Sequence, residues 1–331
     1  MSLVDPALLE AARALAGAEI VELTPCTGGG NNRVFRLVTP DGVFALKAYR
    51  RSANDVRDRL GAEYSGLRYA STVAKESVPA TVAADPEARI AIYEWIEGSR
   101  VSEHGAAEIE EVVRFLGALH AGRNAPWTQT LPYASEAILR PEDLREQLER
   151  RLTVLGEVGG EPDLEALLRG RIAPLTRRFL PALDRVTAPS REQLTLSPSD
   201  FGFHNAMRRA GRLVFLDFEY FGWDDPAKLV CDFLWHPGMV LSPDERSQFL
   251  TGVTDVFIEG TSMVSRLRAY EPLIALRWAT IVLGEFLPEV RERRRYAARG
   301  DLDRDVTQGQ LAKAHAIIDR LENETADRTT S

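Results

Sequence analysis

The sequence pattern changes near Gly98. From about residue 18 to 97, runs of β-branched and aromatic residues alternate with turn formers around one segment of helical periodicity. Beyond Gly98, apolar residues recur at helical spacing, beginning with Ile109, Val112, Val113, Leu116 and Leu119. The pattern predicts an α+β fold with two lobes. A small β-rich N-terminal lobe covers residues 1–97, and a large helical lobe covers residues 98–331.

The N-terminal lobe is expected to hold an antiparallel sheet and two helices. Apolar residues at helical spacing predict an amphipathic helix over residues 3–16. Two β-rich runs follow and are joined by residues 39–42 (Thr-Pro-Asp-Gly), which are typical of a hairpin turn. A second helical segment begins near Val56, and two further strands, separated by a break at residues 85–86 (Asp-Pro), complete the sheet.

The helical lobe contains one clear β signal, over residues 205–217. Two short apolar runs lie on either side of residues 209–212 (Arg-Ala-Gly-Arg), which predicts a hairpin. Opposed residues of paired strands lie about 5 Å apart. Asn205 begins this hairpin and Asp217 ends it, so their side chains can converge on one point. Asp200 lies on the loop that leads into it.

This set of side chains suits phosphoryl transfer. Carboxylate and amide oxygens, together with phosphate and water, are what Mg²⁺ prefers. An additional carboxylate, Asp200, can take a proton from an attacking hydroxyl. Metal on the phosphates and a base at the nucleophile are the elements of phosphoryl transfer. Each residue alone is commonly a turn cap or a strand end, and it is the joint spacing that favours the chemical interpretation.

A phosphate-binding site also needs backbone N–H groups that contact the phosphates and a cationic side chain. Gly28, Gly29 and Gly30 are consecutive at the head of a strand, where their N–H groups can approach phosphate. They match neither the P-loop nor the dinucleotide fingerprint, so alone they indicate only a glycine-rich turn. Lys47 lies in an apolar strand and needs a partner there, for which Glu63 is a candidate. The alternative is a lysine exposed at a strand edge.

Composition excludes several classes of partner. The formal net charge of -8 argues against nucleic acid. The two cysteines, Cys26 and Cys231, are far apart and form no metal-binding spacing, which indicates free thiols in a reducing compartment. There is no basic start before an apolar run and no apolar run of about 18 residues. We therefore expect a cytoplasmic protein, monomer or homodimer, with no membrane and no nucleic-acid partner.

Eight segments in order give this chain a resemblance to a known family. It resembles the aminoglycoside phosphotransferase and choline kinase group, small-molecule kinases with a protein-kinase-like fold. The segments are TGGGNNRVFRL, FALKAY, GAEYSGL, IYEWIEG, LGALHAG, SDFGFHN, LDFEY and DDPAKLVCD. They span most of the chain, and their order is specific.

The resemblance implies that the N-terminal lobe binds ATP, with GTP left open. Lys47 would contact the α- and β-phosphates and pair with Glu63. The connector backbone at Glu94 and Ile96 would hydrogen-bond adenine, with Tyr93 behind it. The implied nucleotide-binding residues are Gly28, Gly29, Gly30, Asn32, Lys47, Glu63, Tyr93, Glu94 and Ile96.

The resemblance also implies a catalytic set. Asp200 would be the catalytic base, and Asn205 and Asp217 would be the Mg²⁺ ligands. Glu219 is a possible second acidic contact. Asp232 would brace the catalytic loop rather than touch substrate.

The chain departs from the family in one place. The family usually has a His-Gly pair before the catalytic aspartate, and this chain has Pro198-Ser199. The missing histidine is chiefly a structural support, and His204, beside Asn205, is a candidate substitute. His120 is expected to pack in the core.

The implied partner is a small-molecule hydroxyl acceptor held by the helical lobe. The candidate region follows Asp225 and includes the helix around Trp278 and Glu285. The residues expected either to contact the substrate or to support residues that do are Glu219, His204, Asp225, Trp278 and Glu285. Aromatic residues there suit a cationic head group, acidic residues suit an aminated sugar, and neutral sugars stay open.

Two other functions compete with a small-molecule kinase. The altered residues 198–199 allow a nucleotide-binding module that transfers nothing. A protein kinase is disfavoured, because the chain lacks D-F-G and A-P-E and leaves little room for an activation loop.

Overall fold

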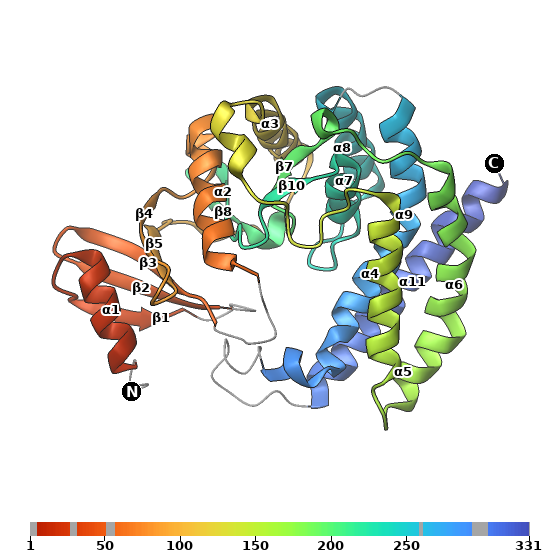
Figure 1. The fold of residues 1–331 in the computed structure, drawn as a ribbon, viewed down its shortest axis with the longest axis horizontal. Coiled ribbons are helices and arrows are strands. Elements are labelled where there is room, and N and C mark those ends of the chain that lie inside the picture. The colour runs from red at the N-terminus through yellow and green to blue at the C-terminus, as the bar shows by residue number, and fades with distance from the viewer. Residues whose placement is uncertain (1–4, 27–31, 51–56, 258–260, 293–303, 331) are drawn as a thin grey trace.

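The computed structural model describes residues 5–26, 32–50, 57–257, 261–292 and 304–330. The N-terminal lobe is built on an antiparallel five-stranded sheet of order β1-β2-β3-β5-β4, with α1 on one face (Figure 1). Its elements are α1 (Pro6–Ala16), β1 (Glu22–Pro25), β2 (Arg33–Thr39), β3 (Gly42–Ala48), α2 (Arg59–Val73), β4 (Thr81–Asp85) and β5 (Ile90–Glu94).

Two local predictions can be checked in this lobe. The hairpin at residues 39–42 is confirmed, since Thr39 pairs with Gly42 where β2 meets β3. The helix predicted over residues 3–16 instead begins at Pro6. The Asp5 side chain accepts a hydrogen bond from the Ala7 N–H at 3.0 Å and caps the helix, with proline at the first helical position.

The helical lobe surrounds two small sheets. Its strands are β6 (Ser99–Arg100), β7 (Thr195–Ser197), β8 (Ala206–Arg209), β9 (Arg212–Phe215) and β10 (Gly222–Asp224). Its longer helices are α3 (Ala106–Gly122), α4 (Pro141–Gly156), α5 (Pro162–Leu167), α6 (Ala173–Phe179), α7 (Pro226–Trp235), α8 (Pro243–Val256), α9 (Thr261–Val282) and α11 (Arg304–Thr330). Short helical turns are η2 (Pro126–Thr130), η3 (Leu168–Ile172), η4 (Leu180–Arg185), η5 (Arg191–Gln193), η6 (Phe203–Asn205) and η7 (Leu283–Phe286), while η1 (Lys75–Ser77) belongs to the N-terminal lobe.

The hairpin predicted inside the helical lobe is confirmed as β8 and β9. Ala210 and Gly211 form its turn, and both have positive φ, 48° and 80°, as a tight hairpin turn requires. The structure adds β6, which pairs with β8 and brings the segment after the N-terminal sheet onto the hairpin.

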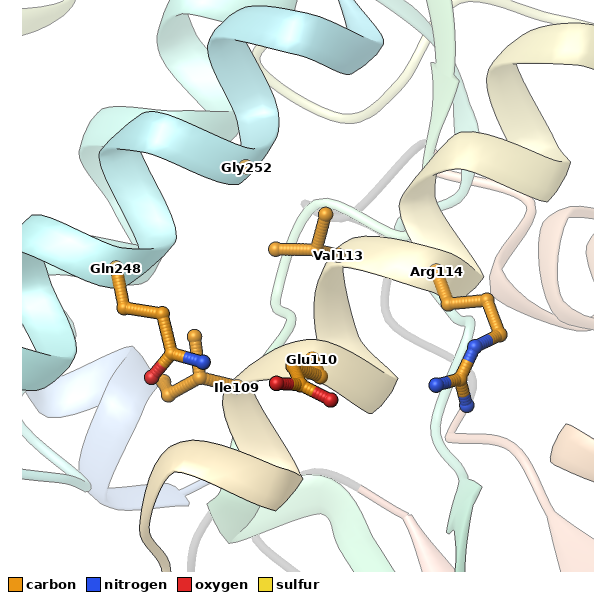
Figure 2. Close-up of a pocket in the computed structure, with 6 residues that line it drawn as sticks. All are labelled: Ile109, Glu110, Val113, Arg114, Gln248 and Gly252. Atoms are coloured by element: carbon orange, nitrogen blue, oxygen red, sulfur yellow. The ribbon is translucent and has the colours of Figure 1, made fainter.

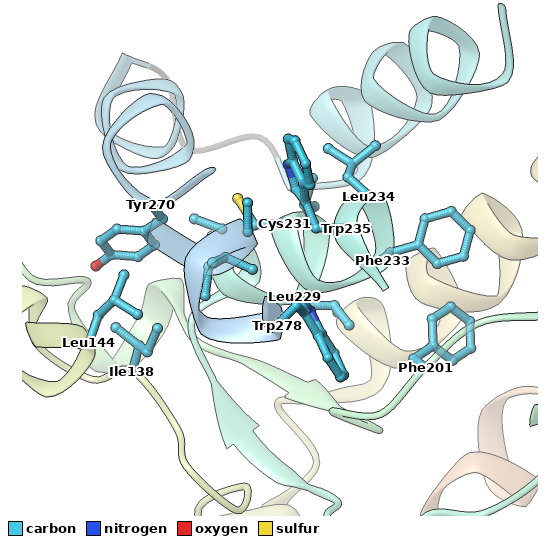
Figure 3. Packing of buried hydrophobic residues seen from close by; sticks show 14 of the residues in the cluster. Ile138, Leu144, Phe201, Leu229, Cys231, Phe233, Leu234, Trp235, Tyr270 and Trp278 are labelled. Atoms are coloured by element: carbon cyan, nitrogen blue, oxygen red, sulfur yellow. The ribbon is translucent and has the colours of Figure 1, made fainter. Parts of the chain in front are cut away.

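Helix α7 forms the centre of the helical lobe. Every residue from Pro226 to Trp235 is buried, and Figure 3 shows its side chains packed against α9. Tyr270 and Leu273 of α9 are fully buried in the same cluster. Such close packing fixes the position of the chain that leaves α7. None of the helices in the described ranges is both long and apolar enough to cross a lipid bilayer.

Helix α2 joins the two lobes. A Cβ placed on Gly66 would lie 2.5 Å from the Phe221 ring, so only glycine allows this close approach. The Tyr69 hydroxyl donates to the Leu119 carbonyl of α3. These contacts hold α2, and the Glu63 that it carries, against the helical lobe.

Candidate active site

Lys47 projects from β3 between two carboxylates. Its Nζ lies 2.6 Å from Glu63 Oε2 and 2.6 Å from Asp217 Oδ1. The expected pairing with Glu63 is confirmed. The alternative of an exposed edge lysine is wrong, because β3 is flanked by β2 and β5 and Lys47 is only 8% exposed. An unpaired charge would be costly there, so the two carboxylates explain the lysine.

The ionic states follow from this arrangement. Burial by itself lowers the pKa of Lys47, but the charges of Asp217 and Glu63 outweigh it and hold the pKa well above its usual value. Burial raises the pKa of Glu63 to about 7, against the opposing effect of Lys47. Lys47 therefore carries a full positive charge at the mouth of the site at neutral pH.

Asp217 and Asn205 lie together at the open end of the β8–β9 hairpin. The Leu216 N–H donates to the Asn205 carbonyl at 2.8 Å and closes that end. Asp217 has a φ of 64°, a left-handed conformation that aspartate tolerates better than most residues. The Asn205 Nδ2 donates to the Asp200 carbonyl at 3.0 Å, so the amide oxygen of Asn205 points away from that carbonyl.

These groups fit a divalent cation. Asp217 contributes a carboxylate that is 38% exposed, and Asn205 contributes an amide oxygen. The pKa of Asp217 is raised because of burial, and the neighbouring charges of Glu219 and Asp200 add to the effect. A bound cation would relieve that repulsion between carboxylates.

Asp200 is held by two histidines. His204 Nε2 lies 3.2 Å and His236 Nε2 lies 2.9 Å from the same oxygen, Oδ1. The two imidazoles stack with ring centroids 3.7 Å apart and planes within 5°. Burial raises the pKa of Asp200, but the hydrogen bonds from His204 and His236 outweigh it and hold the pKa well below its usual range. Asp200 is therefore ionised and can accept a proton.

His236 was not among the residues predicted from the sequence. It follows directly after α7, in the segment His-Pro-Gly, and its ring contacts Asp200. The only local indication in the sequence is a histidine followed by the turn-forming residues Pro-Gly, and nothing nearby in the sequence connects this histidine with Asp200. Burial lowers the pKa of His236, so the ring is neutral at neutral pH.

Lys228 supports the loop that carries Asp200. Its Nζ lies 2.8 Å from Asp224, 2.9 Å from Asp232 and 3.5 Å from the Ser199 hydroxyl. Asp232 was expected to brace this loop, and it acts through Lys228 rather than directly. Ser199 has a φ of 68°, a region that favours glycine. The glycine that the resemblance implies at this position would adopt such a conformation without strain.

Asn32 and Glu219 connect the two lobes. The Asn32 Nδ2 donates to Glu219 Oε2, and Arg59 NH1 lies 2.6 Å from Glu219 Oε1. Glu219 is only 1% exposed, and both of its oxygens have protein partners. The structure thus places it as a link between lobes instead of an open acidic contact. Gly28, Gly29 and Gly30 lie outside the described residues.

The connector residues lie at the end of β5. The Tyr93 hydroxyl is 2.7 Å from that of Tyr49, which in turn donates to Glu63. The Glu94 carboxylate contacts Arg209 at 2.6 Å, while Ile96 is buried at 6% exposure. Tyr93 therefore belongs to the hydrogen-bonded cluster around Lys47.

The residues predicted near the acceptor differ in where the structure places them. Asp225 is fully buried, caps α7 through the Ala227 N–H and pairs with Arg266 at 2.8 Å. Glu285 is 4% exposed. Neither faces open space, so the expectation of a direct contact with an acceptor is corrected for both, and a position behind such a site stays a prediction. Trp278 adjoins the cluster of Asp200, His204 and His236, with its ring centroid 4.4 Å from that of His236.

His120 packs in the core, as expected. It is 9% exposed, its Nδ1 lies 3.1 Å from the Thr195 hydroxyl, and its ring meets Phe257 edge to face. It contributes to the contact between α3 and β7.

A separate pocket of about 300 Å³ lies between α3 and α8 (Figure 2). Its lining residues are Ile109, Glu110, Val113, Arg114, Gln248 and Gly252. None of them belongs to the cluster around Lys47 and Asp200, so this pocket is not the candidate active site.

The fold and the site together define a class of protein. A small antiparallel sheet with a buried Lys-Glu pair, placed over a loop with Asp200 and Asn205 and followed by Asp217, is a bilobed protein-kinase-like arrangement. Residues 22–257 match the model of the phosphotransferase enzyme family, and the chain belongs to this family. Among curated protein sequences, none gives a significant match.

Solved structures share this fold over nearly the whole chain. The gentamicin complex of APH(2")-IIa has a TM-score of 0.63 at 15% identity, covering 95% of this chain and 97% of that one. A choline/ethanolamine kinase family protein from Mesorhizobium loti has a TM-score of 0.56 at 18% identity, covering 94% of each. A putative fructosamine-3-kinase from Thermobifida fusca has a TM-score of 0.55 at 17% identity, covering 93% and 97%. The predicted fold class is confirmed.

Proposed function

We propose that this protein is an ATP-dependent kinase that moves the γ-phosphate to a hydroxyl of a small molecule. The acceptor belongs to the aminoglycosides, amino sugars, sugars or amino alcohols. The observation that carries the proposal is the ionised Asp200, held beside Asn205 and next to the Lys47–Asp217 pair. Membership of the phosphotransferase family supports it.

The N-terminal lobe would hold the nucleotide. Lys47 is fixed by Glu63, so it can turn from Asp217 to the α- and β-phosphates without losing its buried partner. Asn205 and Asp217 would hold Mg²⁺, which when bound neutralises charge on the phosphates. Asn32 lies at the end of the glycine-rich segment and is anchored to Glu219.

The helical lobe would hold the acceptor and accept its proton. Asp200 takes the proton of the acceptor hydroxyl while that oxygen attacks the γ-phosphorus, and the bond from the γ-phosphorus to the β–γ bridging oxygen breaks so that ADP leaves. Trp278 adjoins this cluster and is only 8% exposed.

Mass spectrometry of a pooled small-molecule extract tests the proposal. The protein is incubated with the pool, Mg²⁺ and ATP, or GTP in parallel, beside an Asp200→Asn control. We expect a phosphorylated species with wild type that is reduced about 10²- to 10⁴-fold in the variant, the range for loss of a general base. Binding of Mg·ATP without any new species from several pools would instead support the inactive nucleotide-binding module.

A further inference from the structure

His236 is oriented by the backbone of its own turn. Its Nδ1 accepts a hydrogen bond from the Gly238 N–H at 2.9 Å. A ring nitrogen that accepts carries no proton, so the neutral ring must carry its proton on Nε2. That Nε2–H points at Asp200 Oδ1, 2.9 Å away. The Gly238 contact thereby makes His236 a hydrogen-bond donor to Asp200.

We propose that His236 is a positioning residue that fixes the Asp200 carboxylate for proton transfer. Its Nε2–H binds Oδ1, as does His204, and the second oxygen, Oδ2, is directed to the acceptor hydroxyl. This inference rests on the proposed function, in which Asp200 is the catalytic base. In this chain Pro198-Ser199 replaces the usual His-Gly pair, and His236, in the turn after α7, would supply the support that the missing histidine gives.

The surroundings of His236 hold the ring in place. The imidazole is 9% exposed, stacks on His204 and meets the Trp278 ring edge to face. A Cβ on Gly238 would lie 2.9 Å from His236 Cε1, so a glycine permits the turn to close this tightly. The turn starts from α7, which is buried throughout. A donor on a rigid element is suited to hold a catalytic group in one geometry.

The same cluster has the composition of a metal site, but its hydrogen bonds argue against one. Ligand atoms of Asp200, His204 and His236 lie within 4.8 Å of one another. A neutral histidine that binds a metal through Nε2 carries a proton on Nδ1 and donates it to an acceptor. At His236 that position faces the Gly238 N–H, a second donor. The geometry therefore favours a hydrogen bond to the carboxylate over coordination.

The tautomer can be measured without any substrate. Long-range ¹H–¹⁵N spectra of the protein labelled at histidine nitrogen, assigned with His236→Gln, report which nitrogen is protonated. We expect a protonated Nε2 and an unprotonated Nδ1 for His236 at neutral pH. A protonated Nδ1 would overturn the inference. This readout is independent of phosphoryl transfer, so it separates failure of this inference from failure of the proposed function.

The role in positioning is tested with three variants. The rate of Mg·ATP hydrolysis with water as the acceptor is measured for His236→Ala, His236→Asn and His236→Gln. We expect Ala to lower kcat roughly 10- to 100-fold, the cost of a misplaced catalytic group, with the KM for ATP unchanged. Gln can place its amide N–H near the position of Nε2 and should recover most of kcat, whereas Asn is too short.

Other outcomes contradict the role. Equal kcat in all folded variants, or a Gln variant no better than Asn, would overturn it. Thermal melting identifies the folded variants, and the Asn–Gln pair suffices if Ala does not fold. Inhibition of wild type by micromolar Zn²⁺ that is lost in His236→Gln would assign the cluster to a metal instead. If wild type itself neither hydrolyses ATP nor phosphorylates any pool, the proposed function has failed, and the tautomer measurement still decides the geometry.

Discussion

Lys47 lies in the middle of an apolar strand, where a lysine is unfavourable unless charged partners are buried with it. Its Nζ pairs with Glu63 of the same lobe and with Asp217 of the other lobe. The charge of Lys47 thus stabilises two carboxylates at once.

The Lys47→Met substitution is expected to lower stability as well as activity. It leaves Glu63 buried without its charged partner, and breaking a buried pair in this way costs about 3 to 5 kcal/mol. Urea unfolding of Lys47→Met, Glu63→Gln and the double variant measures the change in the free energy of unfolding. The double variant should recover part of the loss, since Glu63 no longer leaves a buried charge unpaired and only the partly exposed Asp217 lacks its lysine. Additive losses in the double variant would argue that the two side chains do not interact.

At the scale of elements, local signals predicted most of what was observed. The turn residues at 39–42 and the Ala-Gly turn of the second hairpin each fixed a strand pair. The start of α1 was misplaced because apolar spacing was weighed above the Asp5 cap and the proline after it. The short pairings of β6 with β8 and of β7 with β10 have no local signal, since each joins segments distant in sequence.

The contact of α3 with β7 gives a prediction of pH dependence. Burial lowers the pKa of His120 from 6.5 to about 4, and the Arg123 charge adds to the effect. Because the unfolded chain then binds more protons, stability is full above about pH 6.5 and falls as the pH falls to about 4. The loss attributable to His120 is roughly 1 to 3 kcal/mol.

The His120→Gln variant is the matched comparison, because its amide can still contact Thr195 but does not titrate. Chemical unfolding at several pH values between 4 and 7 should show a shallower pH dependence for the variant. Parallel curves for the two proteins would mean that His120 is not the group responsible.

At the scale of the whole molecule, the candidate site is assembled from segments that only the complete fold brings together. Lys47 and Glu63 come from one lobe, and Asp200, Asn205 and Asp217 from the other. The second set was predictable because a hairpin returns its own ends to one place. His236 was not, since its approach to Asp200 depends on the packing of α7. The burial of Asp225 and Glu285 is likewise a property of the packed lobe.

The link through Glu219 holds this assembly together, and its removal should loosen both fold and site. Glu219→Ala leaves Arg59, which is 4% exposed, without this carboxylate and frees Asn32. We expect a loss of about 3 to 5 kcal/mol in unfolding free energy, as for other broken buried ion pairs. Weaker binding of a non-hydrolysable ATP analogue, measured by calorimetry, should accompany it, because Asn32 anchors the end of the glycine-rich segment.

The matched control is Glu22→Ala, which removes an equal charge from an exposed pair. Glu22 lies 3.4 Å from Arg36, and its side chain is 52% exposed. Exposed pairs contribute about 0 to 1 kcal/mol, so this variant should unfold and bind nucleotide nearly as wild type does. Glu219→Ala behaving like Glu22→Ala in both measurements would show that the lobes are held by apolar packing at Gly66 and Phe221, and that the buried ion pair is dispensable for bringing Lys47 to Asp217.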